Sequence, residues 1–420
     1  MSVPTPHADL LLQILHTDSS LPDPQRLEAL GPLEWEQLTA EAVRYRLAFQ
    51  FNEYLKANKV LQVSVPASCL ARLNQIVRLT RIFNLQRQAQ LRQMLTTCEA
   101  EGIPFLLMKG LWIVDQLYQN MAARASGDID LLFKPEDMPR FTRMVQRLGY
   151  KVDPSIGDIR EIVQGNHEFP LPTLDGSNRY DVHWSMTHPG NESPIDEDKI
   201  WARSDFVTLA GKPCRSLCLE DHVLLLCFHA ANHHRFLYVG PRAMVDIAQA
   251  IKTPPRPIQW GELVTRAQEM GWSRGVWLML DLVREHLGVQ PPQAILDALR
   301  PDNAEDASIR KAALDAMFMD QQSKQKLGIE VVRLFNQASW SERFTHVLRR
   351  LCPGSHFIAG YFQISIHDPR LPWIYPWLYV KRWGLILQKN LPKLLELVSS
   401  NPRRKEELQR SKTIILWLES

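Results

Sequence analysis

The feature that most constrains this chain is the run Gly127-Asp128-Ile129-Asp130-Leu131-Leu132-Phe133. Apolar and polar residues largely alternate in it, which predicts a β-strand, and side chains two positions apart on a strand point to the same face. Asp128 and Asp130 should therefore present neighbouring carboxylates. Two carboxylates this close repel each other unless a cation shares them, and their oxygens are ligands that Mg²⁺ prefers. The run predicts a magnesium site, although an isolated pair of this kind is also typical of a solvated strand edge.

The segment upstream of the acid pair favours the metal site. Residues 102–110 form an apolar run that ends in Lys109-Gly110, and residues 111–118 have helical spacing. This pattern predicts a buried strand, a glycine turn and the start of a helix. Free N–H groups and the helix dipole make such a turn a seat for phosphate, with Lys109 as a positive charge beside it.

Downstream, residues 179–184 predict a second strand, on which Asp181 and His183 share a face. A third carboxylate from a neighbouring strand would complete a two-metal clamp for in-line attack on a phosphorus. Residues 165–172 predict a strand that pairs with this one through a turn at Gly176-Ser-Asn178, which would bring His167 or Glu168 near Asp181. His183 is either a proton shuttle or a hydrogen-bonded structural histidine.

Several motifs in the middle third of the chain occur together. They are Lys109-Gly110, Arg124, Gly127-Asp128-Ile-Asp130-Leu-Leu, Pro135-Glu-Asp137, Leu148-Gly149-Tyr150 and Asp181-Val-His183-Trp184. In this combination the chain resembles the uncharacterised group of the nucleotidyltransferase superfamily, whose fold is polymerase-beta-like. The resemblance continues more weakly from Asp221 to Asp246 and leaves both ends of the chain unexplained.

The resemblance implies a role for each matched residue. Asp128 and Asp130 would hold catalytic Mg²⁺ ions, or Mn²⁺ in their place, and Asp181 would be the third acid, which orients or deprotonates the acceptor. Gly110 would line the triphosphate of a nucleotide such as ATP. Members of the superfamily usually have serine after this glycine, whereas this chain has Leu111, so Lys109 would take over contact with the phosphates.

Two further residues join the candidate nucleotide-binding set. Arg124, just before the acid pair, would either contact phosphate or pair with Asp128, and His183 follows the third acid. The activity that the resemblance implies is transfer of a nucleoside monophosphate from a nucleoside triphosphate to a hydroxyl on a small molecule, a peptide product or RNA. The alternative is an inactive nucleotide- or protein-binding module, antitoxin-like or a scaffold, which the missing serine favours.

The expected fold class is α+β, with a nucleotidyltransferase-type mixed β-sheet and flanking helices between an N-terminal helical region and a C-terminal helical bundle. The expected domains are residues 1–101 (helical), 102–210 (catalytic), 211–350 (helical) and 351–420 (an aromatic and basic helical extension). A chain of 420 residues with 45% hydrophobic residues has room for such cores.

The long helical segment after Pro66 has an apolar stripe on one face and a row of arginines on the other. The stripe comprises Leu70, Leu73, Ile76, Leu79, Ile82, Phe83 and Leu91, and the row comprises Arg72, Arg78, Arg81, Arg87 and Arg92. The row is either a solvated helix face or a positive wall that attracts phosphates. The net charge of only +3 does not require a large basic surface.

The remaining motifs concern metal, membrane and location. Cys214, Cys218 and His222 form at most half a zinc site, and buried free thiols are the other interpretation. The aromatic and basic segment 371–383 suits a membrane surface, a protein partner or tryptophans packed on the helical bundle. Without a signal peptide or an apolar run of about 18 residues, the chain is expected to be soluble and cytoplasmic.

Overall fold

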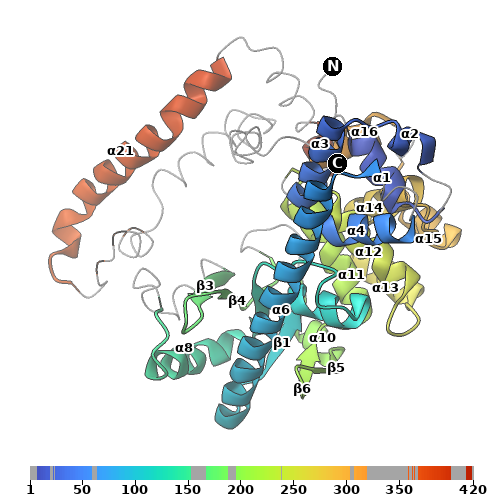
Figure 1. The fold of residues 1–420 in the computed structure, drawn as a ribbon. Coiled ribbons are helices and arrows are strands. Elements are labelled where there is room, and N and C mark those ends of the chain that lie inside the picture. The colour runs from blue at the N-terminus through green and yellow to red at the C-terminus, as the bar shows by residue number, and fades with distance from the viewer. Residues whose placement is uncertain are drawn as a thin grey trace.

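The computed structural model confirms the α+β class: helices flank one six-stranded mixed sheet (Figure 1). The structure describes residues 7–18, 22, 24–58, 64–152, 167–187, 195–237, 239–302, 307–318, 358, 362, 364, 368–398 and 413–418. Residues 319–350 of the expected second helical domain lie outside the described residues. The domain boundaries given above stay predictions.

The sheet has the strand order β3-β4-β2-β1-β6-β5. Its strands are β1 (Phe105–Met108), β2 (Ile129–Phe133), β3 (Glu168–Pro172), β4 (Arg179–His183), β5 (Asp205–Leu209) and β6 (Lys212–Ser216). The β2/β4 and β1/β6 pairs are parallel, and the β1/β2, β3/β4 and β5/β6 pairs are antiparallel. The predicted hairpin is therefore β3–β4, and the predicted acid strand lies at the centre of the sheet.

Strand β2 differs from the half-exposed strand that alternation suggests. All five of its residues are buried, so both faces of this central strand are covered. Asp128 lies just before the strand, and Asp130 is its one charged residue. A carboxylate inside a central strand is costly unless it has charged or hydrogen-bonding partners, which makes its surroundings the important feature of the fold.

Helix α6 (Ala67–Glu101) connects the N-terminal helices to the sheet (Figure 1). It begins after Pro66 and ends at Gly102, whose φ of +62° is the left-handed conformation that glycine adopts easily at a helix end. Leu73 and Leu91 are buried as the stripe predicts, whereas Ile82 and Phe83 are 46% and 45% exposed, and the Arg87 guanidinium lies 6.0 Å from the centre of the Phe83 ring.

Two polar side chains of α6 hold the loops that carry the acids. Buried Asn84 donates to the carbonyls of Met121 and Arg124, both at 2.8 Å, and accepts from the Ser126 N–H at 3.3 Å. Gln90 bonds the β3–β4 turn through Asp175 at 3.1 Å, and its carbonyl accepts from the Tyr180 hydroxyl at 2.9 Å. The long helix therefore fixes the approach to both β2 and β4.

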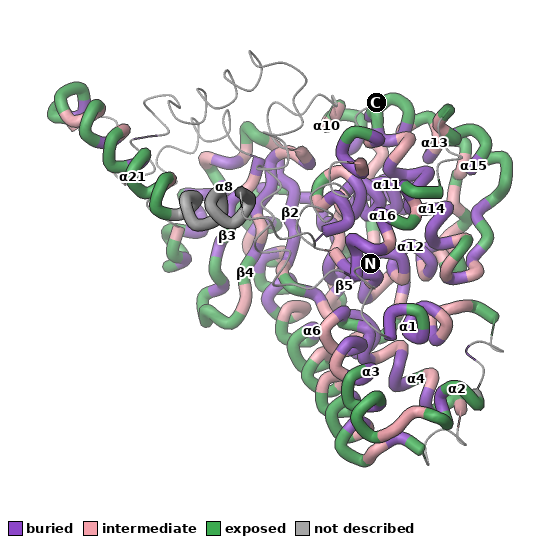
Figure 2. The backbone as a smooth tube through the Cα atoms, turned by 90° about the horizontal axis from the view of Figure 1, so that it is seen from above, coloured by how far each residue is buried: buried purple, intermediate pink, exposed green. Residues whose placement is uncertain are grey.

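Most of the other described helices contribute to the rest of the core. They are α1 (Ala8–Leu15), α2 (Pro24–Glu28), α3 (Pro32–Arg44), α4 (Ala48–Ala57), α7 (Gly110–Trp112) continued by a π-helix (Ile113–Tyr118), a 3₁₀ turn (Pro135–Asp137) leading into α8 (Met138–Arg147), α10 (Glu197–Ala202), α11 (Leu219–Phe228) continued by a π-helix (His229–His233), α12 (Arg242–Lys252), α13 (Trp260–Glu269), α14 (Ser273–Leu287), α15 (Gln293–Leu299), α16 (Ala307–Met317) and α21 (Leu371–Val398). Figure 2 shows the buried chain concentrated in β2 and α11, and one apolar cluster extends from Ala8 to Trp417.

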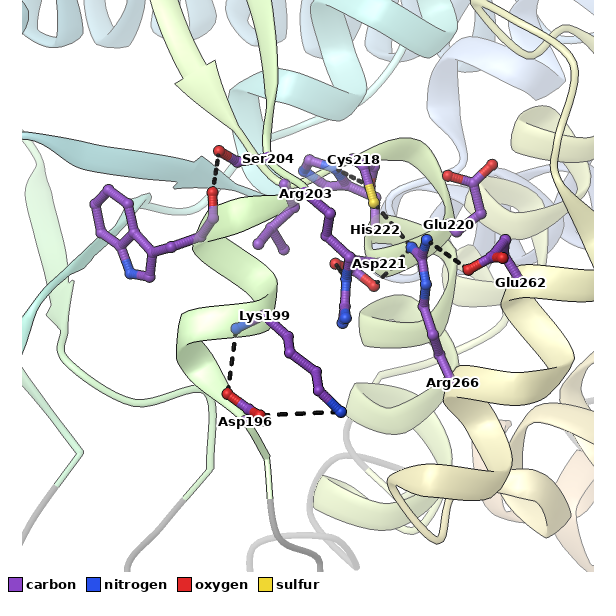
Figure 3. A network of polar contacts seen from close by, with 12 residues as sticks. Asp196, Lys199, Arg203, Ser204, Cys218, Glu220, Asp221, His222, Glu262 and Arg266 are labelled. Atoms are coloured by element: carbon purple, nitrogen blue, oxygen red, sulfur yellow. Dashed lines mark hydrogen bonds and ion pairs between the residues drawn. The ribbon is translucent and has the colours of Figure 1, made fainter.

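Arginine–carboxylate pairs join the sheet to the helices that follow it, at the start of α11. Buried Asp221 accepts from Arg203 Nε at 2.7 Å and from Arg266 Nη1 at 3.2 Å, so α10, α11 and α13 meet at one carboxylate (Figure 3). Next to it, both oxygens of Glu220 accept from Arg256 at 2.7 Å. Burial alone would raise the pKa of Glu220, but the hydrogen bonds from Arg256 lower it to about 2.

Helix α21 carries the aromatic segment. Trp373, Trp377 and Trp383 are 86%, 59% and 40% exposed, so these tryptophans do not have the packed environment that one interpretation expected. Lys381 lies 4.9 Å from the centre of the Trp377 ring. Among the described helices, none is both long enough and apolar enough to cross a membrane.

Candidate active site

Three carboxylates converge at the centre of the sheet, two from the adjacent parallel strands β2 and β4 and one from the residue just before β2. The register places Asp130 of β2 directly opposite Asp181 of β4, and Asp128 lies two residues before Asp130. One carboxylate oxygen from each of the three acids lies within 4.8 Å of the others. The Asp130 side chain is 7% exposed, that of Asp181 16% and that of Asp128 30%, so the group opens to solvent on the Asp128 side. This all-oxygen set fits a hard divalent ion.

Three basic side chains contact these carboxylates. Arg179, two residues before Asp181 on β4, lies 3.0 Å from Asp181 Oδ1 and 3.4 Å from Asp128 Oδ2. Lys109 Nζ is 3.5 Å from Asp130 Oδ1, and His183 Nε2 is 3.3 Å from the same oxygen. The three carboxylates are therefore unequally compensated.

The pKa values of two of the acids are displaced in opposite directions. Burial would raise the pKa of Asp130, but Lys109 and the hydrogen bond from His183 lower it to about 2. Burial and the neighbouring charges of Asp128 and Asp130 raise the pKa of Asp181 to about 7, although Arg179 opposes them. Asp130 is thus a fixed anion, whereas Asp181 can gain and lose a proton near neutral pH.

The glycine turn lies against the acids, and only glycine fits there. Lys109 and Gly110 have φ angles of +37° and +25°. A Cβ on Gly110 would lie 2.8 Å from the Ser126 hydroxyl oxygen, 3.1 Å from the Asp128 carbonyl oxygen and 3.8 Å from Asp130 Oδ2. The missing side chain therefore leaves the space beside the carboxylates free. The Ser126 hydroxyl itself donates to the Asp128 carbonyl at 3.0 Å.

Arg124 lies behind this turn. It is buried, and its Nε donates to Asp246 at 2.9 Å while its Nη1 donates to the Gly110 carbonyl at 3.4 Å. Asp246 also accepts from the Tyr118 hydroxyl at 2.9 Å. The expected pairing of Arg124 with Asp128 is therefore wrong, because Asp246 of α12 takes the guanidinium. Contact of Arg124 with phosphate stays a prediction.

The histidine neighbourhood of the site also differs from expectation. The β3/β4 register places Glu168 opposite His183 and Pro170 opposite Asp181, so Glu168 pairs with the histidine and not with the third acid. Glu168 Oε2 lies 3.1 Å from His183 Nδ1. His183 consequently has one carboxylate beside each ring nitrogen.

Cys214, Cys218 and His222 do not assemble a metal site. Both cysteines are buried free thiols, and the His222 ring stacks on Trp112 with ring centres 3.6 Å apart. Among the described residues, the groups with metal-ligand spacing are the three acids and a second set at His167, Glu168 and His183. The free-thiol interpretation is therefore the correct one for this pair.

Sequence reasoning missed Arg179, Ser126 and Arg46. Arg179 had a usable signal, because a residue two positions before Asp181 on a strand faces the same way. Ser126 and Arg46 had none: Arg46 lies beside Gly127 only through packing of the N-terminal helices on the sheet. Of the predicted arginine row, Arg87 donates to the Gly127 carbonyl at 3.3 Å, next to Asp128.

Comparisons with known proteins found two matches, each to part of the chain. A family model described as an uncharacterised nucleotidyltransferase matches residues 31–288, more than half of the chain. Among solved structures, that of the antibiotic-resistance factor ANT(2'')-Ia is similar at 16% sequence identity and a TM-score of 0.28, covering 40% of this chain and 83% of that one. A search of curated proteins gave no significant match.

Proposed function

The chain belongs to the uncharacterised nucleotidyltransferase family and is a transferase, and we propose that it moves a nucleoside monophosphate from a nucleoside triphosphate to a hydroxyl acceptor with Mg²⁺. The observation that carries this proposal is the convergence of Asp128, Asp130 and Asp181 beside the glycine turn. An inactive binding module has no need for three mutually repelling carboxylates, and this favours the enzyme over the scaffold alternative.

The acids would hold the ions, and their environment fits that role. Three oxygen ligands at short mutual distance, one of them opening to solvent, leave coordination positions for phosphate and water. When bound, Mg²⁺ stabilises the negative charge that develops on the phosphoryl oxygens and aligns attacking and leaving oxygens. Mn²⁺ suits the same oxygen ligands.

The cations around the acids would bind the triphosphate. Lys109 lies at the glycine turn, and Arg87 and Arg46 lie next to Gly127, the residue before Asp128. Arg179 is 55% exposed, so its guanidinium is free to turn from the carboxylates toward phosphate when an ion neutralises them. These side chains supply the contacts for which the superfamily usually has a serine after the glycine.

Asp181 would accept the proton of the attacking hydroxyl. The acceptor oxygen forms a bond to the α-phosphorus, the bond from that phosphorus to the bridging oxygen breaks, and pyrophosphate leaves. Asp181 lies opposite Asp130 in the β2/β4 register and its side chain is 16% exposed, so its carboxylate can meet both an ion and the acceptor hydroxyl. ATP or another triphosphate as donor, and a small molecule, peptide product or RNA as acceptor, are the candidates to test.

The experiment incubates the full chain with each α-labelled nucleoside triphosphate, Mg²⁺ and a cell extract, and follows pyrophosphate release and label transfer. Asp128→Asn and Asp130→Asn should each reduce both signals by about a thousandfold or more, because an ion site of this kind contributes several kcal/mol to the transition state. Circular dichroism checks that the variants fold. Full turnover by both folded variants would refute the assignment.

A further inference from the structure

A second cluster of metal-ligating side chains lies beside the acid site, at one end of the β3–β4 hairpin. A ring nitrogen of His167, a ring nitrogen of His183 and a carboxylate oxygen of Glu168 lie within 4.8 Å of one another. Glu168 and His183 are directly opposite in the antiparallel register, so the hairpin itself sets their separation. The His167 carbonyl accepts from the Trp184 N–H at 3.0 Å, which ties the third residue to the same end.

The distances match those between ligands of a tetrahedral ion. Bonds of about 2.1 Å from zinc to nitrogen or oxygen place two tetrahedral ligands about 3.4 Å apart. Glu168 Oε2 is 3.1 Å from His183 Nδ1 and 3.8 Å from His167 Nε2. Side-chain rotations that move these atoms by a few tenths of an ångström would bring both separations to about 3.4 Å.

The orientation of the buried His183 Nδ1 suits metal coordination better than a hydrogen bond to Glu168. The His183 side chain is 6% exposed, and its buried Nδ1 has no aligned hydrogen-bond partner although Glu168 Oε2 is only 3.1 Å away. Two ligand atoms that converge on a shared third point have this relation, because neither is aimed along the line that joins them. A buried ring nitrogen without a partner is costly, and an ion would satisfy it.

The other nitrogen of His183 fixes which tautomer is present. The Asp130 carboxylate, which Lys109 Nζ also contacts at 3.5 Å, accepts hydrogen bonds, so His183 Nε2 donates the hydrogen bond of 3.3 Å to it. In the neutral ring the lone pair then lies on Nδ1, on the side of Glu168. A carboxylate that holds one nitrogen of a histidine while the other ligates an ion is the usual outer support of a zinc site.

We propose that His167, Glu168 and His183 bind a divalent transition-metal ion of the zinc class. Imidazole ligands select such an ion, whereas the all-carboxylate acid site selects a hard ion. The two sites share the Asp130–His183 hydrogen bond, so an ion on His183 strengthens its Nε2–H as a donor and holds Asp130 in place. The binding itself does not depend on the nucleotidyl-transfer proposal.

The test uses the full chain stripped of metal and measures bound Zn²⁺ by equilibrium dialysis with elemental analysis. The visible absorption of added Co²⁺ reports the ligand geometry in the same samples. We expect one tightly bound ion with a tetrahedral spectrum and a higher melting temperature with Zn²⁺. His167→Ala and Glu168→Gln should weaken binding by at least about 10- to 100-fold, the range known for loss of an outer support alone.

The matched control is Asp128→Asn, which removes a carboxylate from the acid site and leaves the hairpin cluster intact. It should retain the ion, whatever its transferase activity. If His167→Ala does not fold by circular dichroism, the isosteric Glu168→Gln variant decides. The proposal is overturned if the wild-type chain binds no stoichiometric Zn²⁺, or if Asp128→Asn loses the ion while the folded hairpin variants keep it.

Discussion

At the start of α11, Glu220 and Asp221 are each held by guanidinium groups at 2.7 Å, whereas Asp128, Asp130 and Asp181 crowd together around fewer cations. Each carboxylate of the first pair has an arginine partner, and the hydrogen bonds from Arg256 lower the pKa of Glu220 to about 2. In the second group the pKa of Asp181 rises to about 7. Glu220, Asp221 and Asp130 are buried, and Asp128 and Asp181 are partly buried. The difference indicates that the junction carboxylates hold the structure together, while the crowding of the three acids supports the ion site that we propose.

The largest expected effect on stability comes from removing one of the two junction carboxylates. Asp221→Ala leaves Arg203 and Arg266 without their buried partner and should lower the free energy of unfolding by about 3 to 5 kcal/mol, measured by chemical denaturation. Glu262→Ala is the matched control, because the exposed Glu262 also pairs with Arg266, at 3.2 Å. It should cost about 1 kcal/mol or less. An equal loss of unfolding free energy in the two variants would mean that the junction carboxylate contributes no more than an ordinary surface ion pair.

Substitution of Gly110 tests whether the site needs the open space beside the acids. Gly110→Ala should cost about 1 to 3 kcal/mol and most of the activity, because its Cβ meets Ser126 and the Asp128 carbonyl in addition to the strained φ. Gly102→Ala has a similarly positive φ but no atom within 4 Å of its Cβ. It should lose some stability and keep its turnover. An active Gly110→Ala enzyme would show that the turn does not need to be open.

A smaller effect is expected from the helix α6 arginines. Arg87→Ala should raise the KM for the nucleoside triphosphate about tenfold, equivalent to about 1.4 kcal/mol, because Arg87 lies beside Asp128. Burial lowers the pKa of Arg87, and the Asp128 charge opposes that change. The exposed Arg92 on the same helix is the control and should leave KM unchanged. An equal rise in KM for both substitutions would indicate that the whole row of arginines attracts the nucleotide, with no specific contact from Arg87.

The pH dependence of stability without divalent ions tests the raised pKa of Asp181. Asp181 holds its proton up to about pH 7 in the folded chain but only to about pH 4 when unfolded. The folded state therefore binds more protons between these values, and stability from this group falls as the pH rises from 4 to 7. Thermal melts should show this slope flattened in Asp181→Asn. An unchanged slope would mean that Asp181 is not the displaced acid.

The local parts of the site followed from the sequence, and the long-range parts did not. Strand periodicity was sufficient to bring Asp128 and Asp130 together and to predict the β3–β4 hairpin. It could not indicate that Asp246 would take Arg124 or that Asn84 would hold the loop before β2, because both contacts depend on how helices pack on the sheet. The same limit applies to Ile82 and Phe83, which have the helical spacing of the stripe but are exposed in the structure.

The central claim is that the three crowded carboxylates form an ion site, and calorimetric titration of Mg²⁺ into the metal-free chain tests it most directly. With a nonhydrolysable nucleoside triphosphate present, we expect Mg²⁺ binding in the wild-type chain, loss of that binding in folded Asp128→Asn, and no change in Glu262→Ala. Equal Mg²⁺ binding by the wild-type and Asp128→Asn chains, or none by either, would contradict the account.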